Sequence, residues 1–547
     1  MKRNLLLIIA LFVCVLSFGQ GEIDAYRYSN DDLSGTARGQ AMGGAFGALG
    51  GDVTGVAINP AGIGIYRSSE ILANMSLTAP IISGNTNQQS NTAFHFDNLS
   101  YMSYYPLIKG SMLSLNFGFN YNRIKSFDQK YSTSKSSMSS SLTDNMALLT
   151  NGISSSTLLS TSTYNPYNNP HNPWLSVLGY DGCLFIPANN TNNQYQSILN
   201  DGEKVSPSLK VSEKGKVESY DFTIGANISN KFYWGATVSI INLSYIMNSS
   251  YDESFGEGGG FNLDNYLETK GSGYQAKLGV IFKPVDALRL GVSYHSPVWY
   301  SMTDYYKGWI DPRGIYIDDQ LAGEVSTPGG DSQNSNSPAY TDYHFRTPGS
   351  WTFSAAAVLG TKAIVSVDYE IKNYASMNLK DTNGNEWTDV NDFMNSDYRN
   401  ASTIRAGFEY RFNPQLSGRV GYAWAQSPYQ SEVNAFGDNN FDVVGDVAVT
   451  AGTVPHYTLS GNTNYLTAGI GFKFTPQFYC DFALVLRTEK DDVYYFTPKA
   501  FQNQTEKVND YYYRPQQDQN HLQIFDSFAG AFTNKTLKGL LTFGYKF

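Results

Sequence analysis

Residues 113–122 read LSLNFGFNYN, with an apolar or aromatic side chain at every odd position and a small or polar one between. Successive side chains of a β-strand point to opposite faces, so this segment predicts a strand with one apolar and one polar face. Strands of soluble sandwiches alternate in the same way. The segment alone therefore does not distinguish a soluble sheet from a membrane sheet.

Repetition of the pattern does distinguish them. Pairs of alternating runs flank short segments rich in Asn, Pro, Gly and Asp, which are typical of tight turns. The clearest turns are residues 229–231, 284–286, 360–362, 413–415 and 475–477. Long polar excursions separate the hairpins, near residues 81–91, 126–217, 247–270, 300–346, 376–399, 427–462 and 491–534. Short turns on one side and long loops on the other are typical of an outer-membrane barrel.

Counting the alternating runs gives about fourteen strands, with boundaries good to a few residues. They cover residues 69–80, 92–105, 110–125, 218–229, 231–246, 271–283, 287–299, 347–360, 362–375, 400–412, 416–426, 463–474, 478–490 and 535–547. Bacterial barrels have an even number of strands and long outer loops, which places the turns and both termini in the periplasm. We therefore predict an all-β fold, an antiparallel transmembrane β-barrel over residues 69–547 whose largest loop is 126–217. This loop is expected to be mostly irregular, with a short helix near residues 142–149.

The N-terminus predicts export. Lys2 and Arg3 precede an apolar run that ends near Phe18 and is shorter than the roughly 20 residues a transmembrane helix needs. Residues 1–19 are therefore expected to be a signal peptide. Cys183 in a long loop and Cys480 beside a short turn should lie at opposite ends of the barrel, so no disulfide is expected.

Composition agrees with a barrel and argues against a nucleic-acid partner. The formal net charge is −10, and the 40 Tyr and 32 Phe supply the aromatic residues of two interfacial girdles. The last strand presents Leu541, Phe543, Tyr545 and Phe547 on one face. Terminal aromatic residues of this kind resemble the signal that outer-membrane proteins present to the barrel-assembly machinery.

The stretch before the first strand, residues 20–68, is too rich in Gly and Ala to be barrel wall. Such a density of glycine allows close backbone packing, so we predict a small helical or irregular plug inside the lumen. Residues 31–34 could begin a helix there. A phosphate-binding loop is the rejected alternative, because the segment lacks a P-loop lysine and follows no strand.

Several motifs along the chain resemble those of the FadL/TodX family of outer-membrane transporters for long-chain fatty acids and aromatic hydrocarbons. The resemblance lies in Gly35-Thr36-Ala37-Arg38, Met42-Gly43-Gly44-Ala45, Gly51-Asp52, Asn59-Pro60-Ala61-Gly62, residues 290–297 and residues 405–423. The long loops do not share it. Some relatives are labelled haem receptors, but the six scattered histidines include no haem-attachment pair.

The resemblance implies passive uptake of a hydrophobic or amphipathic ligand, which enters a lumen pocket and leaves through a lateral gap when an N-terminal hatch shifts. Asn59, Pro60 and Ala61 would be the hatch motif. Gly118 is the candidate for a strand kink, since glycine weakens a strand where it must bend. The alternative is that Gly118 is small to make room for the plug.

Charged residues of both signs are expected on the lumen wall. Asp368, Glu370 and Lys372 alternate with apolar residues on one strand, and the next hairpin carries Arg405, Glu409, Arg411 and Arg419. The favoured interpretation is a salt-bridge network that holds the plug. The alternative is a head-group site for a fatty-acid carboxylate, for which Arg405 is the best candidate.

Other functions are weaker alternatives. An outer-membrane hydrolase needs a nucleophile beside a histidine and an acid, and no such motif occurs, so no enzyme activity and no cofactor are expected. Residues near Asp381 have nearly the spacing of a calcium loop, but the glycine is misplaced, so no metal site is assigned. A further alternative, based on the size of loop 126–217, is that the barrel binds or shuttles secreted proteins.

Overall fold

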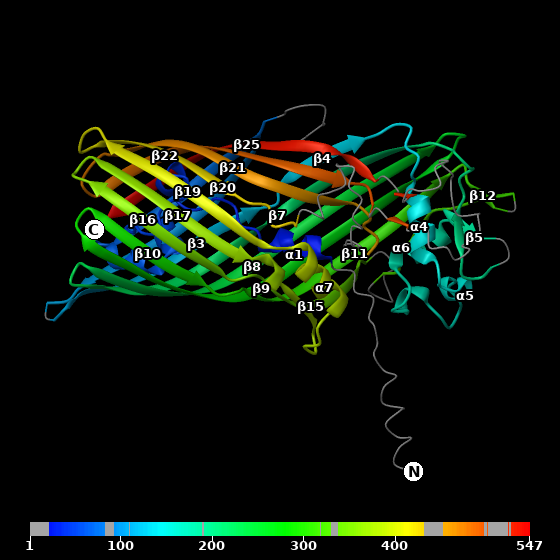
Figure 1. Cartoon of the computed structure of the whole chain (residues 1–547), viewed down its shortest axis with the longest axis horizontal. Helices are drawn as coiled ribbons and strands as arrows, with labels where there is room; N and C mark the ends of the chain where they lie inside the picture. The colour runs from blue at the N-terminus through cyan, green and yellow to red at the C-terminus, as the bar shows by residue number, and fades with distance from the viewer. Residues whose placement is uncertain are drawn as a thin grey trace, which may run out of the picture.

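The computed structural model describes residues 21–81, 92–108, 110–188, 191–317, 319–329, 337–430, 452–496, 500–501, 523–524 and 527–547. Its main feature is a closed barrel of fourteen antiparallel strands (Figure 1). In order around the wall these are β1 (Glu70–Pro80), β2 (Ala93–Pro106), β3 (Met112–Ser126), β7 (Val205–Ile228), β8 (Phe232–Phe255), β9 (Gly260–Val285), β10 (Leu288–His295), β16 (Ser350–Leu359), β17 (Ala363–Asn373), β19 (Asn400–Arg411), β20 (Leu416–Ala425), β21 (Tyr457–Lys473), β22 (Phe478–Tyr494) and β25 (Phe528–Lys546). β25 pairs with β1 and closes the ring.

The predicted fold is confirmed, and each predicted strand overlaps one of these fourteen. The predicted signal peptide, residues 1–19, lies outside the described residues. On β3 the alternation sorts as expected, with Asn116 and Asn120 buried toward the lumen and Phe117 exposed. Around the wall the outward face is a belt of exposed apolar side chains that includes Phe96, Leu99, Phe222, Val238, Leu278, Phe353, Val367, Phe408, Val420, Leu466, Phe482 and Leu484.

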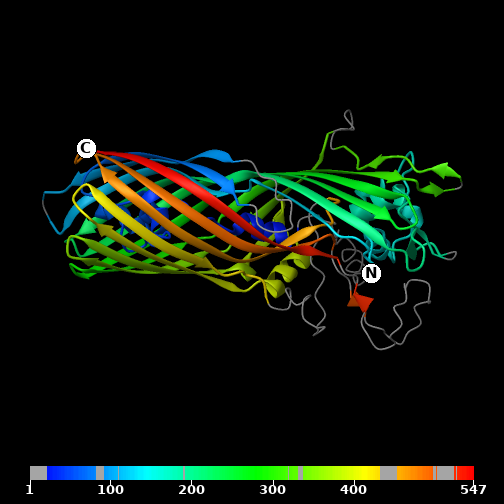
Figure 2. The same cartoon turned by 90° about the horizontal axis from the view of Figure 1, so that it is seen from above.

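Three strands are much longer than predicted. β7 and β8 have 24 residues each and β9 has 26, whereas crossing a bilayer takes about 9–11. Their alternation continues past the apolar belt with Ser, Lys and Asn on the outward face, a pattern that apolar periodicity does not detect. The extra halves project beyond the barrel at its loop end, as the view from above shows (Figure 2).

These projecting halves form a structure that we call the annex. β4 (Gln129–Ser134) pairs with β7, β11 (Trp299–Arg313) pairs with the upper half of β9, and β15 (Ala339–Arg346) pairs with β11. Smaller elements are β5 (Phe185–Pro187), β6 (Tyr195–Ser197), β12 (Tyr316–Ile317), β13 (Gln320–Leu321), β14 (Val325–Ser326), η4 (Tyr374–Ser376), β18 (Asn378–Asp381), α7 (Thr388–Asp397), β23 (Ala500–Phe501) and β24 (Gln523–Ile524). The annex thus continues the barrel wall as a curved sheet.

Segment 126–217, predicted as a mostly irregular loop, contains α4 (Leu142–Thr150), α5 (Ser155–Leu158), η3 (Pro166–Asn168) and α6 (Trp174–Asp181), besides β4 and half of β7. The short helix expected near residues 142–149 is α4. A capping box of Ser141 and Asp144 begins it. The irregular interpretation was wrong because the helices are short and are stabilised by packing against the sheet, not by strong periodicity.

Glu253, near the end of β8 and well outside the apolar belt, ties α4 to the sheet. Its carboxylate accepts hydrogen bonds from the Ser141 hydroxyl, from Leu142 N at 3.1 Å and from the Tyr251 hydroxyl at 2.5 Å. Burial raises the pKa of Glu253 from 4.5 to about 7. When folding raises the pKa of a carboxyl, the folded state is most stable at low pH, where the carboxyl is protonated in both the folded and the unfolded state. That stability is lost as the pH increases from 4.5 through 7.

We therefore expect the annex to be less stable at pH 8 than at pH 4.5, by up to about 3 kcal/mol. Hydrogen exchange of the α4 amides, corrected for the intrinsic exchange rate, should show this loss in the wild type. Glu253→Gln should remove most of the pH dependence, whereas Glu257→Gln, on an exposed residue close by, should keep it. Equal pH profiles for all three proteins would contradict this role for Glu253.

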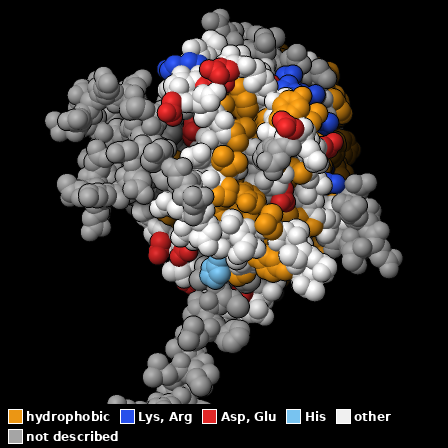
Figure 3. Space-filling model, turned by 90° about the vertical axis from the view of Figure 1, so that its right-hand side faces the viewer, with side chains coloured by type: hydrophobic (Ala, Val, Ile, Leu, Met, Phe, Trp, Pro, Cys, Tyr) orange, Lys and Arg blue, Asp and Glu red, His pale blue; other side chains and the backbone are white. Residues whose placement is uncertain are grey.

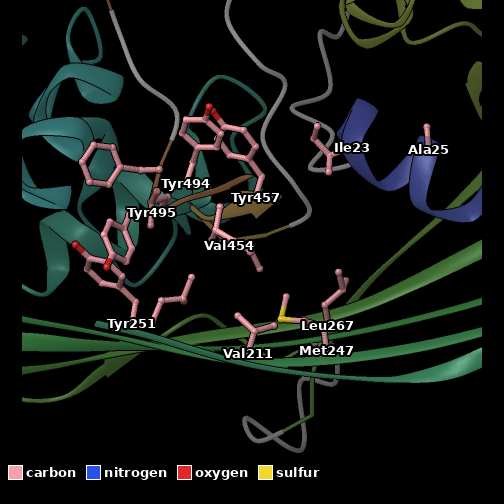
Figure 4. Packing of buried hydrophobic residues seen from close by; sticks show 14 of the residues in the cluster. Ile23, Ala25, Val211, Met247, Tyr251, Leu267, Val454, Tyr457, Tyr494 and Tyr495 are labelled. Atoms are coloured by element: carbon pink, nitrogen blue, oxygen red, sulfur yellow. The ribbon is translucent and has the colours of Figure 1, made fainter. Parts of the chain in front are cut away.

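A large apolar cluster joins the annex to the loop end of the lumen. It brings Tyr251, Met247 and Leu267 of the sheet together with Tyr457 and Tyr494 of β21 and β22 (Figure 4). Ile23 and Ala25 reach the same cluster from α1 (Glu22–Ser29). The Tyr457 and Tyr494 rings are stacked, with centroids 4.9 Å apart. This core fixes α1 against the wall.

The segment before β1 lies inside the barrel. It contains α1, α2 (Ala37–Ala41), α3 (Val53–Ile58) and η2 (Pro60–Ile65), seen in blue within the wall in Figure 1. Thr36 and Asp52 cap α2 and α3, because their side chains accept from Gly39 N and Thr54 N. We call residues 21–69 the lumen segment. Within it α2 contacts β20, β21, β22 and β25, and η2 contacts β3, β7, β8 and β9.

The helix expected to begin at residues 31–34 is absent, and those residues form an irregular link with a bend at Leu33 between α1 and α2. Asp31 is used instead in an ion pair with Lys372 of the wall. Phe547 lies at the turn end, and α1, the first described element, lies toward the loop end. Among the described residues no helix is long and apolar enough to span a bilayer.

Candidate functional site

Asn59 joins the lumen segment to the barrel wall. Its Oδ1 accepts from Ala61 N at 3.1 Å, so the side chain caps η2. Its Nδ2 donates to Gly47 O at 2.9 Å and to Val280 O of β9 at 3.1 Å. The side chain is almost completely buried. One amide thus satisfies backbone groups on both sides of the interface between the lumen segment and the wall.

Pro60 and Ala61 follow as the first residues of η2. Pro60 needs no donor at this position and has the φ that a helix start requires. Ala61 is fully buried against Tyr233 and Ile281 of the wall. The three motif residues therefore act together, as the seat of η2 on β8 and β9.

A row of glycines in the wall makes room for the close packing of η2. Gly225, Gly235 and Gly279 lie opposite one another on β7, β8 and β9. A Cβ on Gly235 would lie 2.2 Å from Pro60 O, and one on Gly279 would lie 1.9 Å from Asn59 Oδ1. Across the lumen, Gly407 and Gly421 form a second pair, where a Cβ would lie 2.4 Å from Met42 O and 2.2 Å from Gly43 N respectively. These glycines were not predicted as site residues, because only strand register brings them together.

Gly118 faces the lumen in β3. Its pairing with β2 and β7 is continuous, and the register shifts of β3 against β7 lie at Met112–Ser114 and Arg123–Lys125. A Cβ on Gly118 would lie 2.4 Å from the sulfur of Met102 and 3.0 Å from Ile63 of η2. The structure therefore favours the alternative in which Gly118 is small to make room for the lumen segment.

The predicted wall charges form two groups. In the first, Glu370 pairs with Arg405 and with Lys372 at 3.6 Å, and Lys372 pairs with Asp31 of the lumen segment. Asp368 accepts from the backbone N–H groups of Phe46 and Gly47 at 3.0 and 2.9 Å. Arg405 is thus already paired, although its Nη1 has no hydrogen-bond partner among the described residues.

In the second group, Glu409 lies between two arginines. It pairs with Arg419 at 2.7 Å and with Arg38 of α2 at 2.9 Å, and Arg419 also pairs with Asp481 at 2.6 Å. Arg411 stands apart at the turn end, exposed, with its guanidinium 3.4 Å from Thr361 O. Both groups hold the lumen segment, and their partners Asp31, Arg38 and Asp481 were not predicted.

The terminal aromatic residues lie outside the barrel. Phe543 and Tyr545 are exposed on the outward face of β25, and the Phe543 ring stacks on Phe478. Phe547 is also exposed, while its backbone pairs with Ser69 N and O at 3.1 and 3.0 Å. The C-terminus therefore ends on the wall as an aromatic patch.

Two cavities lie beside the link between α1 and α2. The larger, about 390 Å³, is lined by Arg27, Asp32 and Leu33 and by residues of β1, β2, β3, β22 and β25. The smaller, about 180 Å³, is lined by Lys277, His295, Glu370, Lys372 and Arg405. Both border Tyr26, Asn30, Asp32 and Leu33. A shift of this short link would alter both spaces.

The larger cavity reaches a seam in the wall. In the described residues, β2 and β3 pair only from Asn98–Asn122 to Pro106–Ser114. Beyond that point side chains bridge them: Arg123 pairs with Asp97 at 2.7 Å, and His95 lies 3.8 Å from Asp128. Farther toward the loop end the wall continues, since Tyr131 of β4 stacks on Phe532 of β25. The seam is thus a stretch in which the described residues of β2 and β3 do not pair with each other, although β2 still pairs with β1 and β3 with β7.

The remaining candidates, Asp381 and His295, make contacts within the fold. Asp381 accepts from Asn383 N and Asn385 N at 2.8 Å each, which makes it the centre of a turn. Within the described ranges, no cluster of three or more His, Cys, Asp or Glu side chains could hold a metal ion. His295 Nε2 lies 2.9 Å from Ile58 O and thus contacts the lumen segment.

No protein-family model and no curated protein matches the sequence. Similar solved structures include a Pseudomonas aeruginosa FadL homologue, with 13% identity and a TM-score of 0.48 over 94% of this chain and 99% of that one. The Ralstonia pickettii toluene transporter TbuX has 13% identity and a TM-score of 0.47 over 94% and 98% of the two chains. The Pseudomonas putida toluene transporter TodX has 12% and 0.44 over 94% and 99%. These include members of the family that the sequence motifs resemble.

Proposed function

We propose that the protein is an outer-membrane channel for passive uptake of hydrophobic or amphipathic small molecules of the fatty-acid or hydrocarbon kind. The observation that carries the proposal is the cavity of about 390 Å³ that extends from the lumen segment to a seam in the barrel wall. A ligand in such a cavity has a short path to the apolar belt, and transfer of apolar surface into lipid is favourable. A water-filled pore would offer no such path.

The proposed location is supported by the same barrel. Its outward apolar belt suits a bilayer, and the aromatic C-terminus suits recognition by the barrel-assembly machinery of a Gram-negative outer membrane. Residues 1–19 would be the export signal, with the turn end in the periplasm and the annex outside the cell. The lumen segment would act as a hatch, held by Asn59 and by the two charge groups.

The test is native mass spectrometry of the barrel extracted from its own membrane, combined with uptake of a pyrene-labelled fatty acid into outer-membrane vesicles. We expect a co-purified amphiphile and uptake that depends on the barrel. An empty lumen, together with no uptake of fatty acid or alkane, would refute the proposal.

Asn59→Ala should loosen the hatch. The substitution removes the donor to Val280 O and the cap on Ala61 N, and lost buried hydrogen bonds cost about 1–3 kcal/mol each. Proteolysis of the lumen segment in detergent should become at least ten-fold faster than in the wild type. Asn413→Ala removes a similar cap from an exposed turn that does not touch the hatch, and should leave the rate unchanged. Equal rates for both variants would show that Asn59 does not hold the hatch.

A second candidate function is binding of a secreted protein by the annex. The annex ends in a face on which apolar side chains form a strip (Figure 3), and exposed Leu159, Ile186, Tyr316 and Leu321 are among the annex residues. Large exposed apolar patches often mark interaction sites. Cross-linking in intact cells from cysteines at these positions would test it. A single cross-linked secreted protein, lost when Ile186 and Leu321 are replaced by Ser, would favour this function over uptake.

A further inference from the structure

The larger cavity has an acidic wall. Glu213, Glu489 and Asp491 line it, and each is about 95% buried. Two arginines form ion pairs with these carboxylates. Arg487 pairs with Glu489 at 2.5 Å, and Arg27 lies 3.8 Å from Glu213 and also pairs with Asp24. Carboxylates therefore outnumber guanidinium groups here. Buried charges are normally paired, because desolvation of an unpaired one is costly.

Asp491 is the carboxylate of these three that forms no ion pair with Arg487 or Arg27. It is 4% exposed, lines the cavity, and its Oδ1 has no hydrogen-bond partner among the described residues. Glu489, by contrast, is satisfied by Arg487 and by Thr463 Oγ1 at 2.8 Å. A buried acceptor that borders an open space points to a donor supplied from that space. An ammonium group would supply both the donor and the missing positive charge.

A second group of charges in the same cavity has the reverse imbalance. Arg123, Lys125 and Lys538 line the cavity beside the seam. A single carboxylate, Asp97, serves two of them, at 2.7 Å from Arg123 and 3.5 Å from Lys538. Lys125 Nζ donates to the backbone oxygen of Arg27 at 2.9 Å, which is not a charged partner. Among the described residues, these three cations thus have one carboxylate within ion-pair distance, while Asp128 and Asp32, which also line the cavity, pair with His95 and with Arg487.

The two groups lie on neighbouring strands of the wall. Lys538 is on β25, which pairs with β22, and Arg123 and Lys125 are on β3, which β1 and β2 separate from β25. Leu33, Ile124, Phe127 and Val485 supply apolar surface in the same cavity, which reaches the seam at His95 and Arg123. The site therefore offers a positive group, a negative group and an apolar route at once.

We propose that this cavity binds the zwitterionic head group of a single-chain amphiphile. Its phosphate or carboxylate lies at Arg123, Lys125 and Lys538, its ammonium group lies at Glu489 and Asp491, and its chain runs toward the seam. The inference rests on the proposed uptake function and narrows its ligand from any hydrophobic molecule to a zwitterionic one. Plain fatty acids and hydrocarbons satisfy only part of the site.

The experiment compares ligands that share one oleoyl chain. Binding to the full barrel in a maltoside detergent is measured for oleate, oleoyl lysophosphatidic acid, oleoyl lysophosphatidylethanolamine and Nα-oleoyl-lysine. We expect the two zwitterions to bind at least ten-fold more tightly than the two anions. Preference between the phosphate and carboxylate zwitterions identifies the source, a phospholipid or an aminoacyl lipid, and either preference supports the site.

The variants separate the inference from the function on which it rests. The double variant Glu489→Gln, Asp491→Asn should lose at least ten-fold in zwitterion affinity and change oleate affinity less than two-fold. Asp492→Asn, the neighbour on β22 that does not line the cavity, should change neither, and the heat-modifiable gel mobility of folded barrels checks folding of all three. Equal affinity for all four ligands, or an unchanged double variant, would overturn the zwitterion site while oleate binding leaves the uptake function standing. Binding of none of the four would overturn both.

Discussion

Gly235→Val is expected to displace the hatch from the barrel without unfolding the barrel. A Cβ at residue 235 would lie 2.2 Å from Pro60 O and 2.7 Å from Ala61 N, and valine adds two methyl groups beyond it. Both contacts are backbone atoms of η2, which cannot rotate away as a side chain can. Overpacking of this kind costs about 1–3 kcal/mol or more, and moving η2 also breaks the Asn59 bond to Val280.

Single-channel conductance in planar bilayers measures the result. We expect the wild type to be closed or nearly so, and Gly235→Val to show frequent large openings, with faster proteolysis of residues 21–69. The matched control is Gly539→Val on β25, where a Cβ would meet only Leu484 at 3.9 Å. That variant should conduct like the wild type. If Gly235→Val also stays closed, the close approach of η2 to β8 does not hold the hatch in place.

The sequence was sufficient for the barrel because each wall strand repeats one signal. Leu113 to Asn122 and its counterparts alternate, and Pro- or Asn-containing turns separate them, so strand number and direction followed. The upper halves of β7, β8 and β9 were missed because Lys210, Ser212 and Lys214 occupy the outward positions that lipid-facing residues occupy lower down. The two faces still alternate there, but the outward face is no longer apolar, so the pattern of hydrophobic residues does not indicate a strand.

Asn59, Pro60 and Ala61 were predicted as the motif that holds the lumen segment, but the wall residues that they contact were not predicted. Gly235 and Gly279 meet it only because β8 and β9 pair in one particular register, with Gly235 opposite Gly279. The charge groups show the same limit: Glu409 was expected on the lumen wall, but its partner Arg38 is 371 residues away in the chain. Sequence patterns report which face a residue occupies, whereas contacts across the lumen depend on strand tilt and register.

Bridging the seam between β2 and β3 is expected to stop ligand passage. Backbone pairing ends at Asn98–Asn122, and beyond it the wall is held by Arg123 with Asp97 and by His95 beside Asp128. A ligand that leaves the larger cavity for lipid has to separate these side chains, which costs less than breaking a hydrogen-bonded strand pair. His95→Cys with Asp128→Cys, in a chain whose Cys183 and Cys480 are Ser, places two thiols across the seam.

A short cleavable thiol cross-linker should then reduce uptake of the pyrene-labelled fatty acid at least ten-fold, and cleavage should restore it. The two single-cysteine variants, treated with the same reagent, control for modification without bridging and should transport normally. His95 and Asp128 line the cavity as well as the seam, so binding of the fatty acid is measured separately, and it should persist while release into lipid is lost. Undiminished uptake in the bridged barrel would mean that the ligand passes the hatch toward the turn end instead.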